Sequence, residues 1–360
     1  MKRVVLAMSG GVDSSVAALL LKRQGYEVIG LFMRTGVHGP SDDTRHEHKK
    51  GCCSAVDAGD ARRVADRLDI PFYALDFEND FGRIMDYFAD EYSRGRTPNP
   101  CVVCNNWLKF GKLWSYGKQV DADFIATGHY VRRVEEGGRA HLHRAADSHK
   151  DQTYVLFGLR RSILPHVLFP IGDLKKDEVR ALAREAGLGV AEKPDSVEIC
   201  FVPDNDHFEF IRGRQRETTA GVIRDTAGKV LAAHDGIERF TIGQRKGMGF
   251  GGGRRRYVLE IVPASGDVIV GDREELLASS LRASRVNWLV ESSGPIRCEA
   301  KIRYASTPSA ATVTPLDGDE VRVEFEEPQT AITPGQAVVF YAGDRLLGGA
   351  WIEEALNELP

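Results

Sequence analysis

A short segment near the start of the chain, residues 9–14, has the residue types of a phosphate-binding loop, Ser-Gly-Gly-Val-Asp-Ser. It follows an apolar run at residues 4–8 and opens a stretch with the apolar periodicity of a helix. Its glycines allow a tight turn that points several backbone N–H groups at one anion, and the N-terminus of the helix adds partial positive charge. The hydroxyl groups of Ser9 and Ser14 can donate to the same phosphate oxygens.

This loop lacks the Gly-Lys-Ser/Thr ending of a Walker-type phosphate loop, and Asp13 stands where a cation would be expected. A carboxylate repels phosphate oxygens unless a divalent cation lies between them, so the sequence predicts Mg²⁺ close to Asp13. The alternative, a Ser-Gly-rich turn without a ligand, is disfavoured by the strand and helix expected on either side.

The loop resembles the pyrophosphate loop of N-type ATP pyrophosphatases, which cleave ATP between the α and β phosphates. The resemblance implies that the substrate is adenylated. It does not identify the substrate, because members of the superfamily act on different ones. By the same resemblance, the residues expected to hold ATP are Ala7, Met8, Ser9, Gly10, Gly11, Val12, Asp13, Ser14, Met33 and Gly128.

Two cysteines, Cys101 and Cys104, follow a Pro-Asn-Pro segment and lead into a stretch with helical periodicity. A cysteine at a helix N-terminus has a lowered pKa and more thiolate at neutral pH. Cys200 lies far downstream and can meet them only through folding. The ordinary interpretation of an isolated buried cysteine is a small hydrophobic side chain.

Four segments in the same order are similar to the 2-thiouridylases of the MnmA/TrmU type: residues 97–105, 150–152, 198–201 and 243–247. That resemblance implies ATP-dependent 2-thiolation of the wobble uridine, position 34, of tRNA. The C2 oxygen would be adenylated with loss of pyrophosphate, and sulfur would then displace AMP. Cys200 would carry a persulfide delivered by a sulfur donor, either a cysteine desulfurase or a sulfur-relay protein. Cys104 would be the nucleophile that attacks the persulfide or helps to release its sulfur, leaving a disulfide for reduction.

Cys101 keeps a second interpretation open, because many members of this family have Asp at this place. Together, Cys101, Cys104 and Cys200 also resemble a three-cysteine iron–sulfur site. Persulfide chemistry is the favoured interpretation, and a labile cluster remains the alternative.

The same resemblance places Asn99, Pro100 and Cys101 near a flipped target base, since an enzyme that modifies a stacked base must extrude it. The residues that it implies as tRNA contacts are His129, Lys150, Asp151, Gln152, Arg303, Tyr304 and Gln336. Each has an ordinary alternative, such as a satisfied histidine at a strand end, an exposed helix start or a plain strand surface. Residues 243–257 are rich in Arg and Lys without any acidic residue, which predicts contact with phosphate.

Another polar stretch, residues 38–54, contains His38, His46, His48, Cys52 and Cys53. Its composition could suit zinc, but the spacing fits no established zinc module. A mobile loop near the ATP site is the favoured interpretation.

These residues require a scaffold, and the first two hundred residues alternate β-type runs with amphipathic stretches, as in a doubly wound sheet. Strands are predicted at residues 4–8, 27–33, 72–77 and 123–130, and helices at 14–23, 55–68, 81–94, 105–119 and 176–186. Beyond residue 206 the pattern predicts β structure, including strands at 283–288, 299–305, 320–326 and 337–341. We expect a mostly parallel α/β domain at 1–205, a central β-rich domain at 206–278 and a C-terminal β-barrel at 279–360.

Composition limits the functional classes further. The chain has 360 residues, 42% of them hydrophobic, a net charge of −4 and six cysteines. This size predicts two or three domains, and so few scattered cysteines do not form the disulfide framework of a secreted protein. No run is long and apolar enough for a membrane span, so the sequence predicts a cytoplasmic protein. Because the net charge is negative, any tRNA binding must use local basic patches.

Two rival functions fit parts of the pattern. A ligase or amidase of the same superfamily that acts on a small metabolite would not need Cys104 or Cys200, and it would cleave ATP fully without tRNA. A tRNA-binding or sulfur-carrier protein without ATP turnover would not need the intact loop at residues 9–14.

Overall fold

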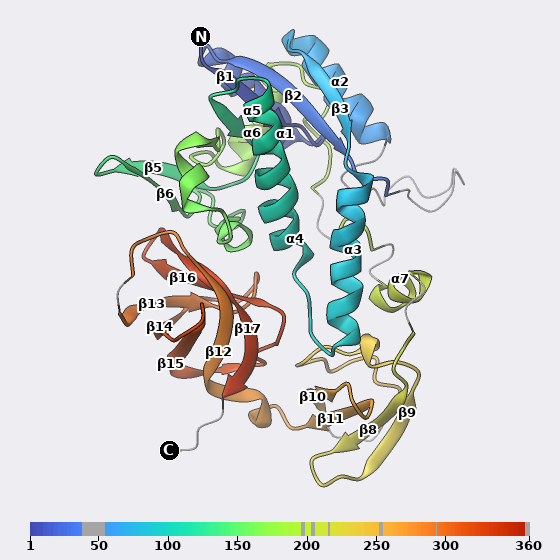
Figure 1. Ribbon diagram of the computed structural model, residues 1–360. Coiled ribbons are helices and arrows are strands. Elements are labelled where there is room, and N and C mark those ends of the chain that lie inside the picture. Colours follow the sequence, from blue (N-terminus) through green and yellow to red (C-terminus); the bar gives the residue numbers. More distant parts are fainter. Residues whose placement is uncertain are drawn as a thin grey trace. The chain divides into compact units, whose positions relative to one another are not determined.

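The computed structural model describes residues 1–37, 55–195, 199–202, 206–214, 217–251, 255–292 and 294–356 (Figure 1). The stretch with His38, His46, His48, Cys52 and Cys53 lies outside the described residues, as does Arg254 of the basic segment. The chain divides into two compact units. The first comprises Met1–Ile84, Cys101–Asn205 and Asp344–Leu346, and the second comprises Met85–Pro100, Asp206–Gly343 and Leu347–Pro360.

A parallel sheet forms the centre of the first unit. Its described strands, in spatial order, are β3 (Phe72–Asp76), β2 (Glu27–Arg34), β1 (Arg3–Ala7), β4 (Phe124–Ala126) and β7 (Val167–Leu168). Strand β1 is covered on both faces, and its residues Val4, Val5 and Leu6 are fully buried, as expected for an aliphatic strand inside a parallel sheet.

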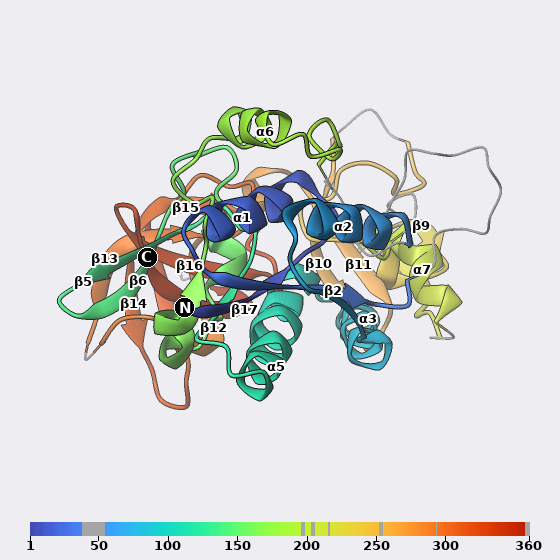
Figure 2. The same ribbon diagram turned by 90° about the horizontal axis from the view of Figure 1, so that it is seen from above.

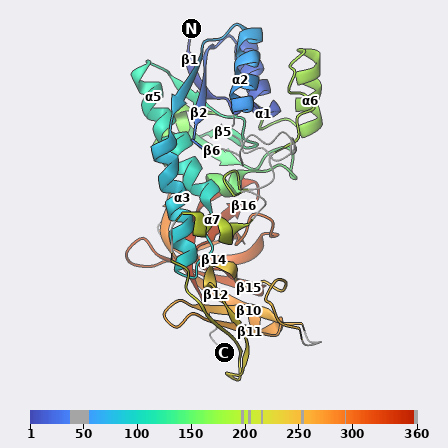
Figure 3. The same cartoon turned by 90° about the vertical axis from the view of Figure 1, so that its right-hand side faces the viewer.

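Helices cover both faces of this sheet. Helices α1 (Val12–Arg23), α2 (Ala55–Leu68) and α6 (Lys176–Glu185) lie on one face, and α5 (Leu113–Gln119) lies on the other (Figure 2). Figure 3 shows the same layers from the side, with β1 and β2 between α5 and α1. This layering brings the strand-to-helix loops to the carboxyl edge of the sheet, where ligands bind in open α/β folds.

The strand predicted at residues 123–130 is wrong beyond Ala126, where β4 ends. Two residues later, Gly128 approaches the phosphate loop so closely that a Cβ atom on it would lie 2.6 Å from the backbone nitrogen of Ser14. The chain leaves the sheet at this point because it turns toward that loop.

The helix predicted at residues 105–119 exists but begins earlier and is not uniform. It consists of α4 (Pro100–Val103), a π-helical segment at Cys104–Lys112 and then α5. Widened π turns inside helices are frequent at functional sites. The prediction missed the hairpin of β5 (Arg132–Glu136) and β6 (Arg139–His143), whereas α3 (Glu78–Ser93) corresponds to the helix expected at 81–94.

A small sheet forms one part of the second unit. Its described strands, in spatial order, are β10 (Tyr257–Val262), β11 (Asp267–Gly271), β8 (Gly221–Asp225) and β9 (Val230–His234). Its core includes Ile223, Val258 and Val268. A helix that the all-β expectation missed, α7 (His207–Gly213), precedes this sheet and is capped by the Asp206 carboxylate, which accepts from Glu209 N at 3.0 Å.

A closed antiparallel barrel forms another part of this unit. Its described strands, in spatial order, are β12 (Leu277–Trp288), β15 (Val321–Thr330), β14 (Ser309–Pro315), β13 (Ile296–Lys301), β16 (Ala337–Ala342) and β17 (Arg345–Leu356), and β12 pairs back to β17. At Gly348 the φ angle is +149°, and a Cβ atom would lie 2.2 Å from the carbonyl oxygen of Asn287, so glycine permits the close approach of β17 to β12. The strand predicted at 299–305 is wrong beyond Lys301.

The predicted fold class is therefore confirmed: a doubly wound parallel sheet, a small β-rich part and a closed C-terminal barrel. Within the described part of the chain, none of the helices combines the length and the apolar character that a bilayer crossing requires.

Candidate active site

The phosphate loop lies between β1 and α1 and is folded by its own side chains. Ser14 Oγ accepts from Ser9 N at 3.2 Å, and Ser15 Oγ donates to the carbonyl oxygen of Gly11 at 2.8 Å. Gly10 has a φ angle of +75°, and a Cβ atom there would lie 2.2 Å from the carbonyl oxygen of Asp57 on α2. Only glycine fits this backbone, so the tight turn expected from the sequence is present at the start of α1.

Several residues predicted to hold ATP surround this loop. Gly128 touches the backbone of Asp13 and Ser14, and Met8 is buried directly beside the loop. Met33 lies near the end of β2, the strand that pairs with β1. The structure thus gathers these residues at the carboxyl edge of the sheet, and their contact with ATP stays a prediction.

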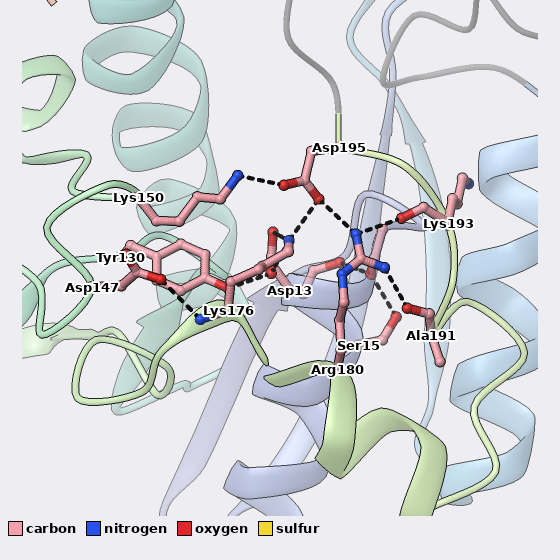
Figure 4. Close-up of polar contacts among 12 residues, drawn as sticks. Asp13, Ser15, Tyr130, Asp147, Lys150, Lys176, Arg180, Ala191, Lys193 and Asp195 are labelled. Carbon is pink, nitrogen blue, oxygen red and sulfur yellow. Dashed lines mark hydrogen bonds and ion pairs between the residues drawn. The ribbon is translucent and has the colours of Figure 1, made fainter. Parts of the chain in front are cut away.

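Asp13 has a cationic partner that the sequence did not suggest (Figure 4). Lys176 Nζ, from the first residue of α6, lies 2.8 and 2.9 Å from the two carboxylate oxygens of Asp13. The phenol of Tyr130 also donates to Asp13, at 2.8 Å. The side chain of Lys176 is only 10% exposed, so this cation is held at the loop. Lys176 supplies a positive charge where the sequence argument required Mg²⁺, and the Mg²⁺ site stays a prediction.

A second carboxylate, Asp195, shares the same lysine. Its carboxylate oxygens lie 2.7 Å from Lys176 Nζ and 2.7 Å from Lys150 Nζ, and Arg180 approaches to 3.4 Å. Burial alone would raise the pKa of Asp195, but hydrogen bonds and charge from Lys150 and Lys176 lower it below its usual range. These groups form an alternating charge network beside the phosphate loop.

Lys193 connects the same region to α2. Its ammonium group lies 2.6 Å from a carboxylate oxygen of Asp57 and 2.6 Å from one of Asp60, and it donates to Gly10 O at 2.9 Å. Burial would lower the pKa of Lys193, but the two carboxylates raise it, so the lysine stays charged. No spacing in the sequence pairs Lys193 with residues so far upstream, which is why the prediction missed it.

The cysteines occupy distinct positions in the first unit. Cys101 is exposed in α4, whereas Cys104, at the start of the π-helical segment, and Cys200 are half-buried. Next to Cys200, Phe201 is buried and packs edge-to-face on Phe81 at 5.6 Å. The described residues, which include all three cysteines, contain no group of three or more His, Cys, Asp or Glu side chains that could hold a metal ion. An iron–sulfur site at Cys101, Cys104 and Cys200, the alternative that the sequence left open, is therefore not shown by these residues.

The side chains at residues 150–152 make contacts inside the first unit. Lys150 pairs with Asp195, Asp151 accepts from Thr153 Oγ1 at 2.6 Å, and Gln152 accepts from Tyr130 N at 2.9 Å. Gln152 is connected to Asp13 through Tyr130, and Lys150 is connected to it through Asp195 and Lys176. These contacts connect the segment to Asp13 of the phosphate loop, and the predicted contact with tRNA stays a prediction.

His129 is buried between aromatic rings. It is 8% exposed, with the rings of Phe110 and Phe169 at 5.9 and 6.5 Å, and its Nδ1 shares a 2.7 Å hydrogen bond with Thr127 Oγ1. Burial, and to a smaller extent the charge of Lys109, hold its pKa well below the usual value. His129 is therefore neutral at physiological pH and does not offer a cation to phosphate.

Replacing His129 by glutamine should reduce the loss of stability on acidification. The unfolded imidazole takes up a proton below about pH 6.5 and the folded one does not, so the wild type loses about 1.4 kcal/mol per pH unit in that range. Urea denaturation at pH 7 and pH 5.5 measures this difference. The exposed His149→Gln serves as the matched variant, and equal pH dependence in His129→Gln and wild type would contradict the buried neutral state.

Among the candidate tRNA contacts of the second unit, Gln336 is half-buried, and the others described here lie on the surface. Tyr304, 47% exposed, follows β13 in a turn, with Lys301 Nζ 5.5 Å from its ring, and Arg303 donates to Thr330 O at 2.6 Å. Arg245 and Lys246 are exposed in the turn-rich segment before β10. These positions are accessible to a nucleic acid, and contact with it stays a prediction.

Comparison with known proteins adds the family context. Residues 2–204 match a family described as the tRNA methyl transferase HUP domain, residues 209–272 one described as the tRNA methyl transferase PRC-barrel domain, and residues 278–352 one described as the aminomethyltransferase beta-barrel domain. A protein of Rhodopirellula baltica is 48% identical over 392 residues, covering 100% of this chain and 98% of that protein. One of Symbiobacterium thermophilum is 49% identical over 363 residues, covering 99% and 93%. Both relatives are named tRNA-specific 2-thiouridylase MnmA.

Proposed function

The chain belongs to the tRNA-specific 2-thiouridylase family, and from this membership we propose that it is an ATP-dependent sulfurtransferase that converts a tRNA uridine to 2-thiouridine. The observation that carries the proposal is identity of nearly one half over the whole chain, which includes the phosphate loop, the cysteine loop and the barrel. The target is the wobble uridine at position 34, and the enzyme works where tRNA is modified, in the cytoplasm.

In the first step the C2 oxygen of the uridine attacks the α-phosphorus of ATP. An O–P bond forms, the bond between the α and β phosphates breaks, and pyrophosphate leaves. The loop at residues 9–14 binds the phosphates, and the cation of Lys176 offsets the charge of pyrophosphate as it departs. ATP enters as its Mg²⁺ complex.

In the second step sulfur replaces the activated oxygen. A sulfur-donor protein loads Cys200 as a persulfide, whose outer sulfur attacks C2 while AMP leaves. The Cys104 thiolate then attacks Cys200 Sγ, so that the bond to the outer sulfur breaks and its electrons form the C=S group. The Cys104–Cys200 disulfide that remains requires a thiol reductant before the next turnover. Asn99, Pro100 and Cys101 receive the extruded base.

The direct test is mass spectrometry of nucleosides from unmodified tRNA incubated with the protein, Mg-ATP, a persulfide source and a thiol reductant. We expect 2-thiouridine, with AMP and pyrophosphate formed in equal amounts. Cleavage of ATP without tRNA and without sulfur in the RNA would favour a superfamily ligase of small metabolites. A methylated nucleoside formed from S-adenosylmethionine would instead favour the methyl transfer named in the matched domain descriptions.

A further inference from the structure

The segment that precedes the cysteine loop is fixed by the barrel within the second unit. Thr97 N donates to Pro334 O at 2.9 Å. The side-chain amide of Gln336 donates to Thr97 O at 3.1 Å and to Pro98 O at 3.0 Å. These hydrogen bonds engage two successive carbonyl groups directly before Asn99 and Pro100.

Gln336 reaches this segment from a rigid support. Its carbonyl oxygen accepts from Ile352 N of β17 at 2.8 Å, and Gly335 N donates to Ile352 O at 2.9 Å. At Gly335 the φ angle is +88°, and a Cβ atom would lie 2.8 Å from Thr97 O, so glycine lets the two backbones meet. Gln336 lies directly before β16 (Ala337–Ala342), and these two hydrogen bonds to Ile352 hold its backbone in place.

Arg96, the residue before Thr97, is held by two carboxylates and by Ile352 O. Its guanidinium group lies 2.9 Å from Glu91 and 2.7 Å from Glu353, and its side chain is 19% exposed. Burial would lower the pKa of Arg96, but the two carboxylates raise it, so the charge persists. Hydrogen bonds or ion pairs therefore hold three consecutive residues, Arg96, Thr97 and Pro98.

The chemistry of the Gln336 amide favours this internal role over a direct contact with phosphate. A glutamine amide has two N–H donors, and both point at protein carbonyl groups. Phosphate oxygens only accept hydrogen bonds, so contact with them would break one of these bonds.

We propose that Gln336 is a positioning residue that holds Thr97 and Pro98 so that Asn99 and Pro100 are ready to receive the target uridine. The inference rests on the proposed function for the identity of the base. The clamp itself, formed by Gln336, Thr97 and Pro98, is a property of the protein without ligands.

Hydrogen–deuterium exchange of the protein without ATP or tRNA tests the clamp. In Gln336→Leu, the carbonyl groups of Thr97 and Pro98 lose their hydrogen bonds to Gln336, so the segment should open more often. The amides of Thr97, which donates to Pro334 O, and of Asn99 are therefore expected to exchange about tenfold faster or more. Gln336→Asn, whose side chain is one methylene shorter, should give the same local effect if the leucine variant is unstable. The matched control is Gln329→Leu on β15, whose amide donates to Glu327 O instead. Unchanged exchange in both Gln336 variants overturns the proposal.

Kinetics with tRNA separates positioning from direct contact. Misplacement of the base-binding segment lowers kcat for 2-thiouridine formation by about 10- to 100-fold, while the Kd for tRNA, set mainly by phosphate contacts, stays within about twofold. A raised Kd with unchanged kcat at saturating tRNA overturns positioning and makes Gln336 a tRNA contact. If the wild type forms no 2-thiouridine, the proposed function is wrong. The exchange experiment, which uses neither ATP nor tRNA, still shows whether Gln336 holds Thr97 and Pro98.

Discussion

Serine in place of Cys200 should abolish formation of 2-thiouridine under persulfide delivery, with a fall in rate of about 10³-fold or more. The thiolate is the group that accepts sulfur from a donor, and a serine hydroxyl cannot carry a persulfide. Cys200 lies beside Phe201, which anchors this part of the chain on Phe81, and serine replaces one atom in a half-buried side chain. The loss should therefore be chemical, with the fold retained.

Cys298 provides the matched control for this experiment. It lies half-buried on β13 of the barrel, and burial raises its pKa to about 12, so it is protonated at neutral pH. Cys298→Ala should thiolate tRNA at the wild-type rate. Millimolar sulfide can bypass the carrier cysteine, so partial recovery of Cys200→Ser with sulfide alone agrees with the carrier role. Full activity of Cys200→Ser with a persulfide donor would contradict it.

The local parts of the site were predictable because they depend on consecutive residues. The loop at residues 9–14 follows a strand and opens a helix. Its two glycines predict a tight turn, and the structure has this turn at Gly10. Gly128 was included through resemblance, and the structure supplies the physical reason, which is its contact with the backbone of Asp13 and Ser14. That same contact explains why the strand predicted around Gly128 ends at Ala126.

The charge network was not predictable, because its members come from distant parts of the chain. Lys176 looked like the start of an amphipathic helix, and nothing in its neighbourhood distinguishes it from Lys175. Only the packing of α6 on the same face of the sheet as α1 brings it to Asp13 (Figure 2). Similarly, β17 escaped prediction because Gly348 and Gly349 weaken an isolated strand, and barrel closure supplies the pairing that stabilises it.

Methionine in place of Lys176 should lower kcat/KM for ATP by about 10²- to 10³-fold, the size of effect seen when one preorganised charge-stabilising donor is removed. The substitution keeps the length of the side chain but removes the cation that lies 2.8 Å from Asp13 and 2.7 Å from Asp195. In this variant the carboxylates of Asp13 and Asp195 repel the phosphates of ATP, because the positive charge of Lys176 is absent. Pyrophosphate release at varied ATP concentration measures the effect, and Lys175→Met, at the exposed neighbouring position, should behave as wild type.

Combining Lys176→Met with Asp13→Asn decides which of two roles the lysine has. Because Asp13 is itself predicted to hold ATP, the double variant is compared with Asp13→Asn alone. If Lys176 only neutralises Asp13, adding Lys176→Met to Asp13→Asn should cost little further activity, since the repulsion has already disappeared with its source. If Lys176 also stabilises the departing pyrophosphate, the double variant should be at least about tenfold slower than Asp13→Asn. We expect the second result, because Lys176 contacts Asp195 as well as Asp13 and keeps its position when one partner is lost. A double variant within about threefold of the Asp13→Asn rate would restrict Lys176 to a structural ion pair.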